Sequence, residues 1–213
     1  MPVDPMNPAT AVTWGPFIQA AYEQFVSAPG QVNPAAITNM PAGYALVRTI
    51  QMTDSFGPVQ SRVFYGFVAV GGTPTTAVVA LRGTATTTEW WNDFQWDLVP
   101  FTQVPGGNVA QGFWDIYNTF GTMIPGQQQS TPAPATFAAR YGALSTVSWR
   151  IYNQVDVVPS FPVDIFDNYQ PVTTGYAINS LGKAKWSLGC AHALNTYMHV
   201  LSPASVPLDS ACS

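Results

Sequence analysis

The run from Thr76 to Leu81 is the feature that most constrains what this chain can fold into. A strand with one face in water alternates apolar and polar side chains, whereas this run is apolar almost throughout. Such a run is typical of a strand that is buried on both faces, in the middle of a sheet. Because segments with strand and helix patterns alternate along the chain, we expect an α/β layer fold.

The rest of the chain is predicted to surround that strand in one domain covering residues 1–213. Thr13 is expected to cap the first helix, and the turn at 54–58 to join two strands in an antiparallel hairpin. In the predicted sheet the hairpin is followed by 76–81 and then by 149–153, and the chain from 156 to 182 is expected to be a loop. Helices are predicted at 13–27, 110–122, 135–144 and 190–201, and strands at 44–52, 61–71, 76–81 and 149–153.

The scarcity of charge excludes some classes of partner. Only 8% of the residues are charged, the net charge is −4, and the seven Lys and Arg residues form no basic run. Nucleic acid binding needs a patch that neutralises phosphates, so we expect no nucleic acid partner. The same scarcity argues against electrostatic docking on anionic membranes. No apolar stretch approaches the roughly 18 residues of a membrane helix, so we expect no stable membrane insertion.

The chain has only two cysteines and two histidines, which limits its possible redox and metal chemistry. Cys190 and Cys212 form a disulfide if the compartment is oxidising, and the alternative is two free buried thiols. No Cys/His spacing suggests zinc, and we expect no metal and no cofactor. Residues 1–8 lack the features of a signal peptide, while the charge-poor composition rich in Gly, Pro, Thr and Asn suits a secreted protein.

Arg82-Gly83-Thr84 directly follows the predicted central strand and is a candidate oxyanion loop. Backbone N–H groups at a strand end can point at a developing negative charge, and the Thr84 hydroxyl can add a donor. The alternative is an ordinary strand-ending turn. The aromatic run that follows is a candidate binding surface for acyl chains, and its alternative is the packing of a lid-like segment. The residues of that run are Trp90, Trp91, Phe94, Trp96 and Phe101.

Asp156 and His192 are the candidate acid and base. Asp156 follows the predicted strand at 149–153, where a carboxylate can orient an imidazole; the alternative is an aspartate that initiates a turn. His192 is predicted to open an apolar helix, where the positive end of the helix dipole favours the neutral imidazole that a general base needs. The alternative for His192 is a core or capping histidine, and we interpret His199 as structural.

Four segments, in this order, resemble the class 3, or fungal-type, lipases of the α/β-hydrolase fold. They are Leu81-Arg82-Gly83-Thr84 with Glu89-Trp90-Trp91-Asn92-Asp93, residues 109–117, residues 150–159 and residues 190–197. The resemblance implies an α/β-hydrolase-like, mostly parallel sheet flanked by helices. It also implies a hydrolase of acylglycerols or related carboxylic esters, with Thr84 as oxyanion donor, Asp156 as acid and His192 as base.

The chain departs from that family at the nucleophile. The Gly-x-Ser-x-Gly turn that should precede the acid is absent, and at 126–129 the chain passes from before the nucleophile strand to after it. We therefore expect a sheet reduced by an internal deletion, with open edges through which the chain could form a homodimer. Ser180 is rejected as a nucleophile, because Ile178 stands where the turn needs a small residue.

Two functions are compatible with these residues. One is a carboxylic ester hydrolase with an ester or lipid substrate and a nucleophile that the sequence does not identify. The other is a catalytically inactive lipase-like protein that binds lipid or another apolar ligand. Labelling by a fluorophosphonate would separate them, because this reagent modifies only an activated serine.

Overall fold

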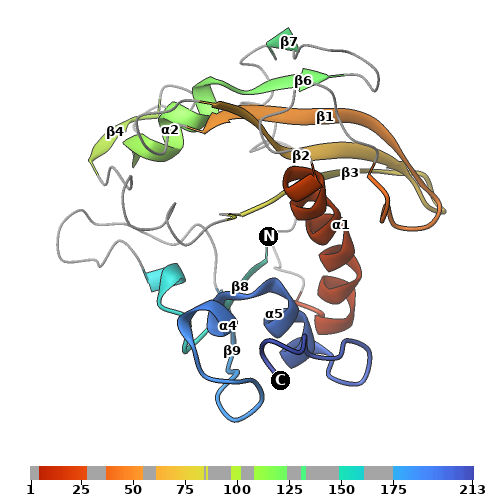
Figure 1. The fold of residues 1–213 in the computed structure, drawn as a ribbon, viewed down its shortest axis with the longest axis vertical. Coiled ribbons are helices and arrows are strands. Elements are labelled where there is room, and N and C mark those ends of the chain that lie inside the picture. The colour runs from red at the N-terminus through yellow and green to blue at the C-terminus, as the bar shows by residue number, and fades with distance from the viewer. Residues whose placement is uncertain are drawn as a thin grey trace. The chain divides into compact units, whose positions relative to one another are not determined.

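The computed structural model describes residues 5–27, 37–54, 61–83, 85, 97–101, 108–123, 131–132, 149–160 and 175–213. Residue contacts divide the chain into two compact units. The sheet unit is Pro16–Ala143, and the terminal unit combines Met1–Gly15 with Leu144–Ser213. Figure 1 shows the helices and strands of both units.

The sheet unit is built on a five-stranded sheet with the order β3-β2-β1-β6-β7 (Figure 1). β1 and β2 pair antiparallel from Tyr44 opposite Gly71 to Asp54 opposite Ser61, so the predicted hairpin is confirmed. A second sheet pairs β4 with β5. The strands are β1 (Tyr44–Asp54), β2 (Ser61–Gly71), β3 (Thr76–Leu81), β4 (Leu98–Pro100), β5 (Asn108–Ala110), β6 (Gly121–Met123) and β7 (Thr131–Pro132).

The prediction of a mostly parallel, α/β-hydrolase-like sheet is wrong. Every strand pair in the five-stranded sheet is antiparallel. The one parallel strand pair in the described part of the chain, β8 (Arg150–Asn153) with β9 (Gly175–Ile178), forms a separate sheet. Only residues 72–75 connect β2 to β3, and this is too short for a parallel pair, which needs a crossover of about a dozen residues or more.

Among the strands that the structure describes, β3 lies at the edge of its sheet, which contradicts the predicted central position. Ala80 is buried, whereas Ala77, Val79 and Leu81 on the opposite face are exposed. Successive side chains of a strand point to opposite faces, so half of the run turns outward. The apolar pattern concealed this arrangement because the outward residues are apolar as well. The strand at 149–153, which was predicted to be the neighbour of β3, is β8, and it pairs with β9 in a separate sheet.

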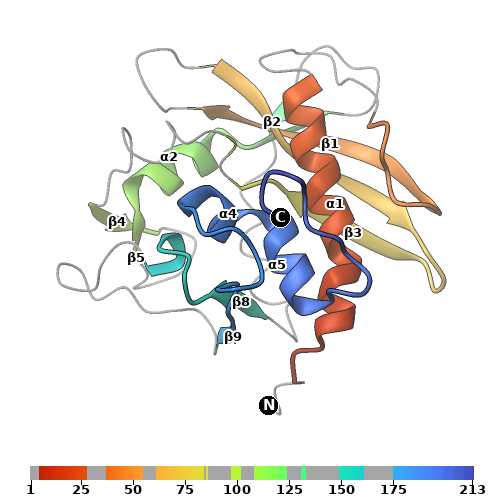
Figure 2. The ribbon, with the colours of Figure 1, turned by 60° about the horizontal axis from the view of Figure 1, so that its bottom comes forward.

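Helices cover both faces of the five-stranded sheet. On one face α1 (Pro8–Ser27) lies across the strands and contributes three buried residues to a cluster with β2 and β3 (Figure 2). On the other face α2 (Gln111–Asn118) contributes Ile116, which packs with Ile50 and Met52 of β1. The α1 cluster contains Phe17, Ala20, Ala21, Phe67, Ala69 and Ala80.

The helix boundaries differ from the predicted ones for local reasons. α1 begins at Pro8, because the Asn7 side chain accepts a hydrogen bond from the Ala9 N–H at 3.0 Å; Asn7, and not Thr13, caps the helix. α2 ends at Asn118, and β6 begins within the predicted helix at 110–122. The predicted helix at 135–144 lies outside the described residues.

The terminal unit holds β8, β9 and two short helices, α4 (Leu188–His192) and α5 (Leu194–Leu201) (Figure 2). The helix predicted at 190–201 is interrupted at Ala193, whose backbone is extended, with φ −62° and ψ 131°. The segment predicted as a loop contains β9 and the 3-10 turn η1 (Val158–Ser160). Among the helices that the structure describes, none is long and apolar enough to cross a membrane.

Candidate active site

Asp156 lies in the turn that follows β8. Its backbone N–H donates to the Asn153 carbonyl oxygen at 3.0 Å, and its side chain is 1% exposed. One carboxylate oxygen, Oδ1, accepts from the Val158 N–H at 3.0 Å, which stabilises the start of η1. Asp156 therefore initiates a turn, as the alternative interpretation predicts, and this bond fixes the orientation of its carboxylate.

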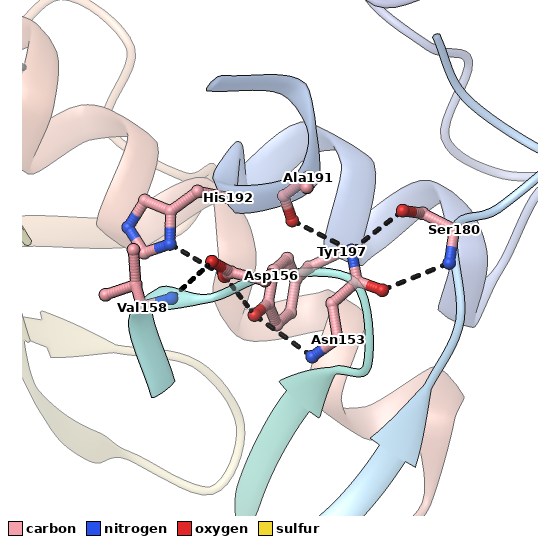
Figure 3. Close-up of polar contacts among 7 residues, drawn as sticks. All are labelled: Asn153, Asp156, Val158, Ser180, Ala191, His192 and Tyr197. Atoms are coloured by element: carbon pink, nitrogen blue, oxygen red, sulfur yellow. Dashed lines mark hydrogen bonds and ion pairs between the residues drawn. The ribbon is translucent and has the colours of Figure 1, made fainter. Parts of the chain in front are cut away.

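The other carboxylate oxygen of Asp156 faces His192. The Nδ1–H of His192 donates to Asp156 Oδ2 at 2.7 Å, and the His192 side chain is 34% exposed (Figure 3). The pair is thus formed by a buried carboxylate and a partly exposed imidazole. A proton on Nδ1 leaves the lone pair of Nε2 as the basic site of the neutral ring. This tautomer and orientation are those that a general base requires.

His192 does not open a helix as predicted; it is the last residue of α4. Ser187 caps α4 by accepting from the Cys190 N–H at 3.1 Å. Cys190 is joined to Cys212 by a disulfide, so of the two cysteine alternatives the structure has the bonded one. The cap holds the N-terminus of the short helix that carries the imidazole, and the disulfide ties the central residue of that helix to the C-terminal tail.

Tyr197 of α5 is a third donor to the Asp156 carboxylate, and the sequence interpretation missed it. Its hydroxyl donates to Oδ2 at 2.6 Å and accepts from the Asn153 N–H at 3.1 Å (Figure 3). Burial raises the pKa of Tyr197 well above its ordinary value, and the hydrogen bond to the charged Asp156 raises it further. Tyr197 therefore keeps its proton and remains a donor across the ordinary pH range.

Asn153 connects this group to the ends of β9 and α4. Its side-chain amide donates to Ser180 Oγ and to the Ala191 carbonyl, both at 2.8 Å, and its Oδ1 accepts from the Ser180 N–H at 3.1 Å (Figure 3). Asn153 and Ser180 are both buried. The Ser180 hydroxyl is thus a partner of an amide that organises the unit, which agrees with its rejection as a nucleophile.

The structure places the other predicted site residues as follows. His199 donates from Nδ1 to the Val206 carbonyl at 2.8 Å, in keeping with a structural role. Arg82 and Gly83 belong to the sheet unit, whereas Asp156 and His192 belong to the terminal unit. Thr84, Trp90, Trp91, Phe94 and Trp96 lie outside the described residues, whereas Phe101 lines an apolar pocket of the sheet unit.

The sheet unit contains an apolar pocket with a volume of about 450 Å³. Aromatic rings form much of its wall: Trp114 lies edge-on to Phe101 at 5.4 Å between centroids and stacks on Tyr117 at 5.9 Å. Arg82 also lines the pocket, and its guanidinium lies between the rings of Phe25 and Tyr65, at 4.0 and 4.3 Å. Its volume lies within the range of small-molecule pockets, and its lining is mostly apolar.

The described residues contain no group of three or more His, Cys, Asp or Glu side chains that could hold a metal ion. No protein-family model and no curated protein matches the chain. The resemblance to class 3 lipases therefore stays a prediction that depends on the residues themselves.

Proposed function

We propose that this protein is a carboxylic ester hydrolase in which His192 is the general base and Asp156 orients it. The observation that carries the proposal is the 2.7 Å hydrogen bond from the imidazole Nδ1 to a carboxylate that is 1% exposed. A buried carboxylate with three donors is fixed in position, so it can hold the ring in one orientation and stabilise the imidazolium that forms during reaction.

The chemistry follows from the tautomer. Nε2 takes the proton of an attacking hydroxyl as its oxygen bonds to the acyl carbon, and the carbonyl oxygen becomes an oxyanion. The imidazolium then gives that proton to the leaving alkoxide as the carbonyl double bond re-forms and the ester C–O bond breaks. Attack by water yields the free acid at once, whereas a serine keeps the acyl group until a water, deprotonated by Nε2 in the same way, releases it. The attacking hydroxyl belongs to a serine or to water, and the experiment below distinguishes the two.

The substrate class is an ester with an apolar acyl chain, such as an acylglycerol. Support comes from the resemblance of four segments to lipases. A secreted location is part of the proposal. It is supported by the Cys190–Cys212 disulfide, because cytosolic thiols are kept reduced.

Turnover of a p-nitrophenyl acyl ester tests the proposal. His192→Ala should lower kcat/KM by about 100-fold or more, the usual contribution of a general base. His199→Ala, which removes the other histidine of the chain, is the matched control and should keep most of the activity. Equal turnover by the native protein and His192→Ala would sink the proposal. A fluorophosphonate adduct would identify a serine nucleophile, and His192-dependent turnover without an adduct would identify water.

A second candidate function is the binding of an apolar ligand without turnover. The aromatic pocket favours it, since 450 Å³ is enough volume for a drug-sized ligand. Binding of a long-chain alcohol, together with turnover no faster than that of His192→Ala, is the result that would select this function over hydrolysis.

A further inference from the structure

Both lysines of the chain lie in one short segment of the terminal unit. Lys183 and Lys185 are the only lysines in a protein that has seven basic residues and a net charge of −4. Both side chains are exposed, and neither pairs with a carboxylate of the residues that the structure describes. We name residues 181–188 the lysine loop; in Figure 1 the blue loop between β9 and α4 projects beyond both elements.

The lysine loop also exposes large apolar side chains. Trp186 is 71% exposed, Leu181 is 63% exposed and Leu188 is 55% exposed. An isolated exposed leucine needs no explanation, whereas a tryptophan and two leucines within one short segment mark an interaction surface. The combination of lysine, tryptophan and leucine is found in segments that lie at the membrane–water interface.

The lysine loop is held in place before it binds anything. Gly182 has φ +73°, and the N–H groups of Lys183 and Ala184 donate to the Ser180 carbonyl at 3.0 and 3.1 Å. The Lys185 N–H donates to the carbonyl of Cys212 at 2.8 Å, and Cys212 is joined by its disulfide to α4. A preorganised loop loses little conformational entropy on binding.

From these features we infer that the lysine loop docks the protein on an anionic lipid surface. Lys183 and Lys185 contact anionic headgroups, while the indole of Trp186 lies at the interface and the two leucines enter the acyl boundary. Because the chain carries few positive charges and none of them form a run elsewhere, the rest of the protein is not attracted to an anionic surface. Docking is therefore confined to the lysine loop. The inference concerns attachment alone and does not depend on ester hydrolysis.

Flotation of the native protein with lipid vesicles tests the inference. Binding to vesicles of equal parts phosphatidylcholine and phosphatidylglycerol should be strong and should weaken at high salt. Lys183→Gln combined with Lys185→Gln should weaken it about 30-fold, or roughly fivefold for each lysine. Trp186→Ser should weaken binding about tenfold or more, also on pure phosphatidylcholine, because it removes apolar burial and not charge.

The matched controls lie in the sheet unit. Arg48→Gln removes an exposed positive charge and Val26→Ser removes an exposed apolar side chain, and both should bind vesicles like the native protein. No vesicle binding by the native protein, or binding that the lysine and tryptophan variants share unchanged, would overturn the inference. Turnover of a soluble short-chain ester, measured in parallel, reports on the hydrolase proposal separately, because Trp186 is no part of the acid–base pair.

Discussion

The Asp156 carboxylate shows how one side chain serves a turn and a site together. Oδ1 accepts from the Val158 N–H, and Oδ2 accepts from both His192 and Tyr197. Burying a carboxylate is costly unless its oxygens are hydrogen-bonded, and here each oxygen has a donor. The donor from η1 therefore prevents the carboxylate from turning away from the imidazole.

Tyr197→Phe is predicted to destabilise the protein by about 1.5–3 kcal/mol, the usual value of a hydrogen bond to a charged group. The change removes a donor to Asp156 and leaves the Asn153 N–H without its acceptor. Urea denaturation of the native and variant proteins measures the difference. Tyr176→Phe is the matched control, because Tyr176 is exposed, and it should change the free energy of unfolding by less than about 0.5 kcal/mol. Equal losses in the two variants would contradict the prediction.

At the level of single residues, the sequence was sufficient to predict that Asp156 and His192 lie together, and insufficient to predict their surroundings. Asp156 and His192 were recognisable because they lie in the segments 150–159 and 190–197, which resemble the acid and base segments of class 3 lipases. Tyr197 was not recognisable, because an aromatic residue at helical spacing from Leu194 and Val200 is typical of a core. Asn153 could have been noticed as a polar residue at the end of an apolar strand.

At the level of elements, local sequence patterns predicted the strands of the hairpin correctly, but they did not predict which strands pair with one another. The hairpin followed from two β-rich segments close together in the chain, and its register shifts between Leu46 and Arg48 and again between Ile50 and Gln51. The position of β3 could not be read from its own residues, because burial of a strand depends on which neighbours it finds. The short connection after Gly71 was the signal that should have indicated an antiparallel partner.

Cys190→Ser is predicted to lower the free energy of unfolding by about 3 kcal/mol, the loop-entropy value for a bridge that closes a loop of this length. The disulfide spans 22 residues and fixes the C-terminal tail against α4, which carries His192. Thermal or urea unfolding measures the loss. Cys212→Ser and the double variant should lose the same amount, because the bridge is broken once in each. A double variant twice as destabilised as either single variant would show that the thiols, and not the bridge, stabilise the fold.

At the level of the whole molecule, the raised pKa of Tyr197 links stability to alkaline pH. In the unfolded chain this phenol loses its proton near its ordinary pKa of about 10, whereas in the folded protein burial and Asp156 keep the proton bound. Above that pH the unfolded state binds fewer protons than the folded state, so the free energy of unfolding falls as the pH rises. The stabilisation from Tyr197 is complete below about pH 10 and is lost above it.

The native protein and Tyr197→Phe share all other tyrosines. The difference between their free energies of unfolding therefore reports the pH dependence that comes from Tyr197 alone. The difference should be constant from about pH 7 to about pH 9 and should shrink as the pH rises beyond about 10. Urea denaturation across that range measures it, and both cysteines of the chain are bonded, so thiol chemistry does not interfere. A difference that grows with pH would mean that the folded state favours the phenolate, which is incompatible with a Tyr197 hydroxyl that donates to a charged Asp156. The alkaline limit of stability thus reports on the same hydrogen bond that holds the carboxylate against the imidazole.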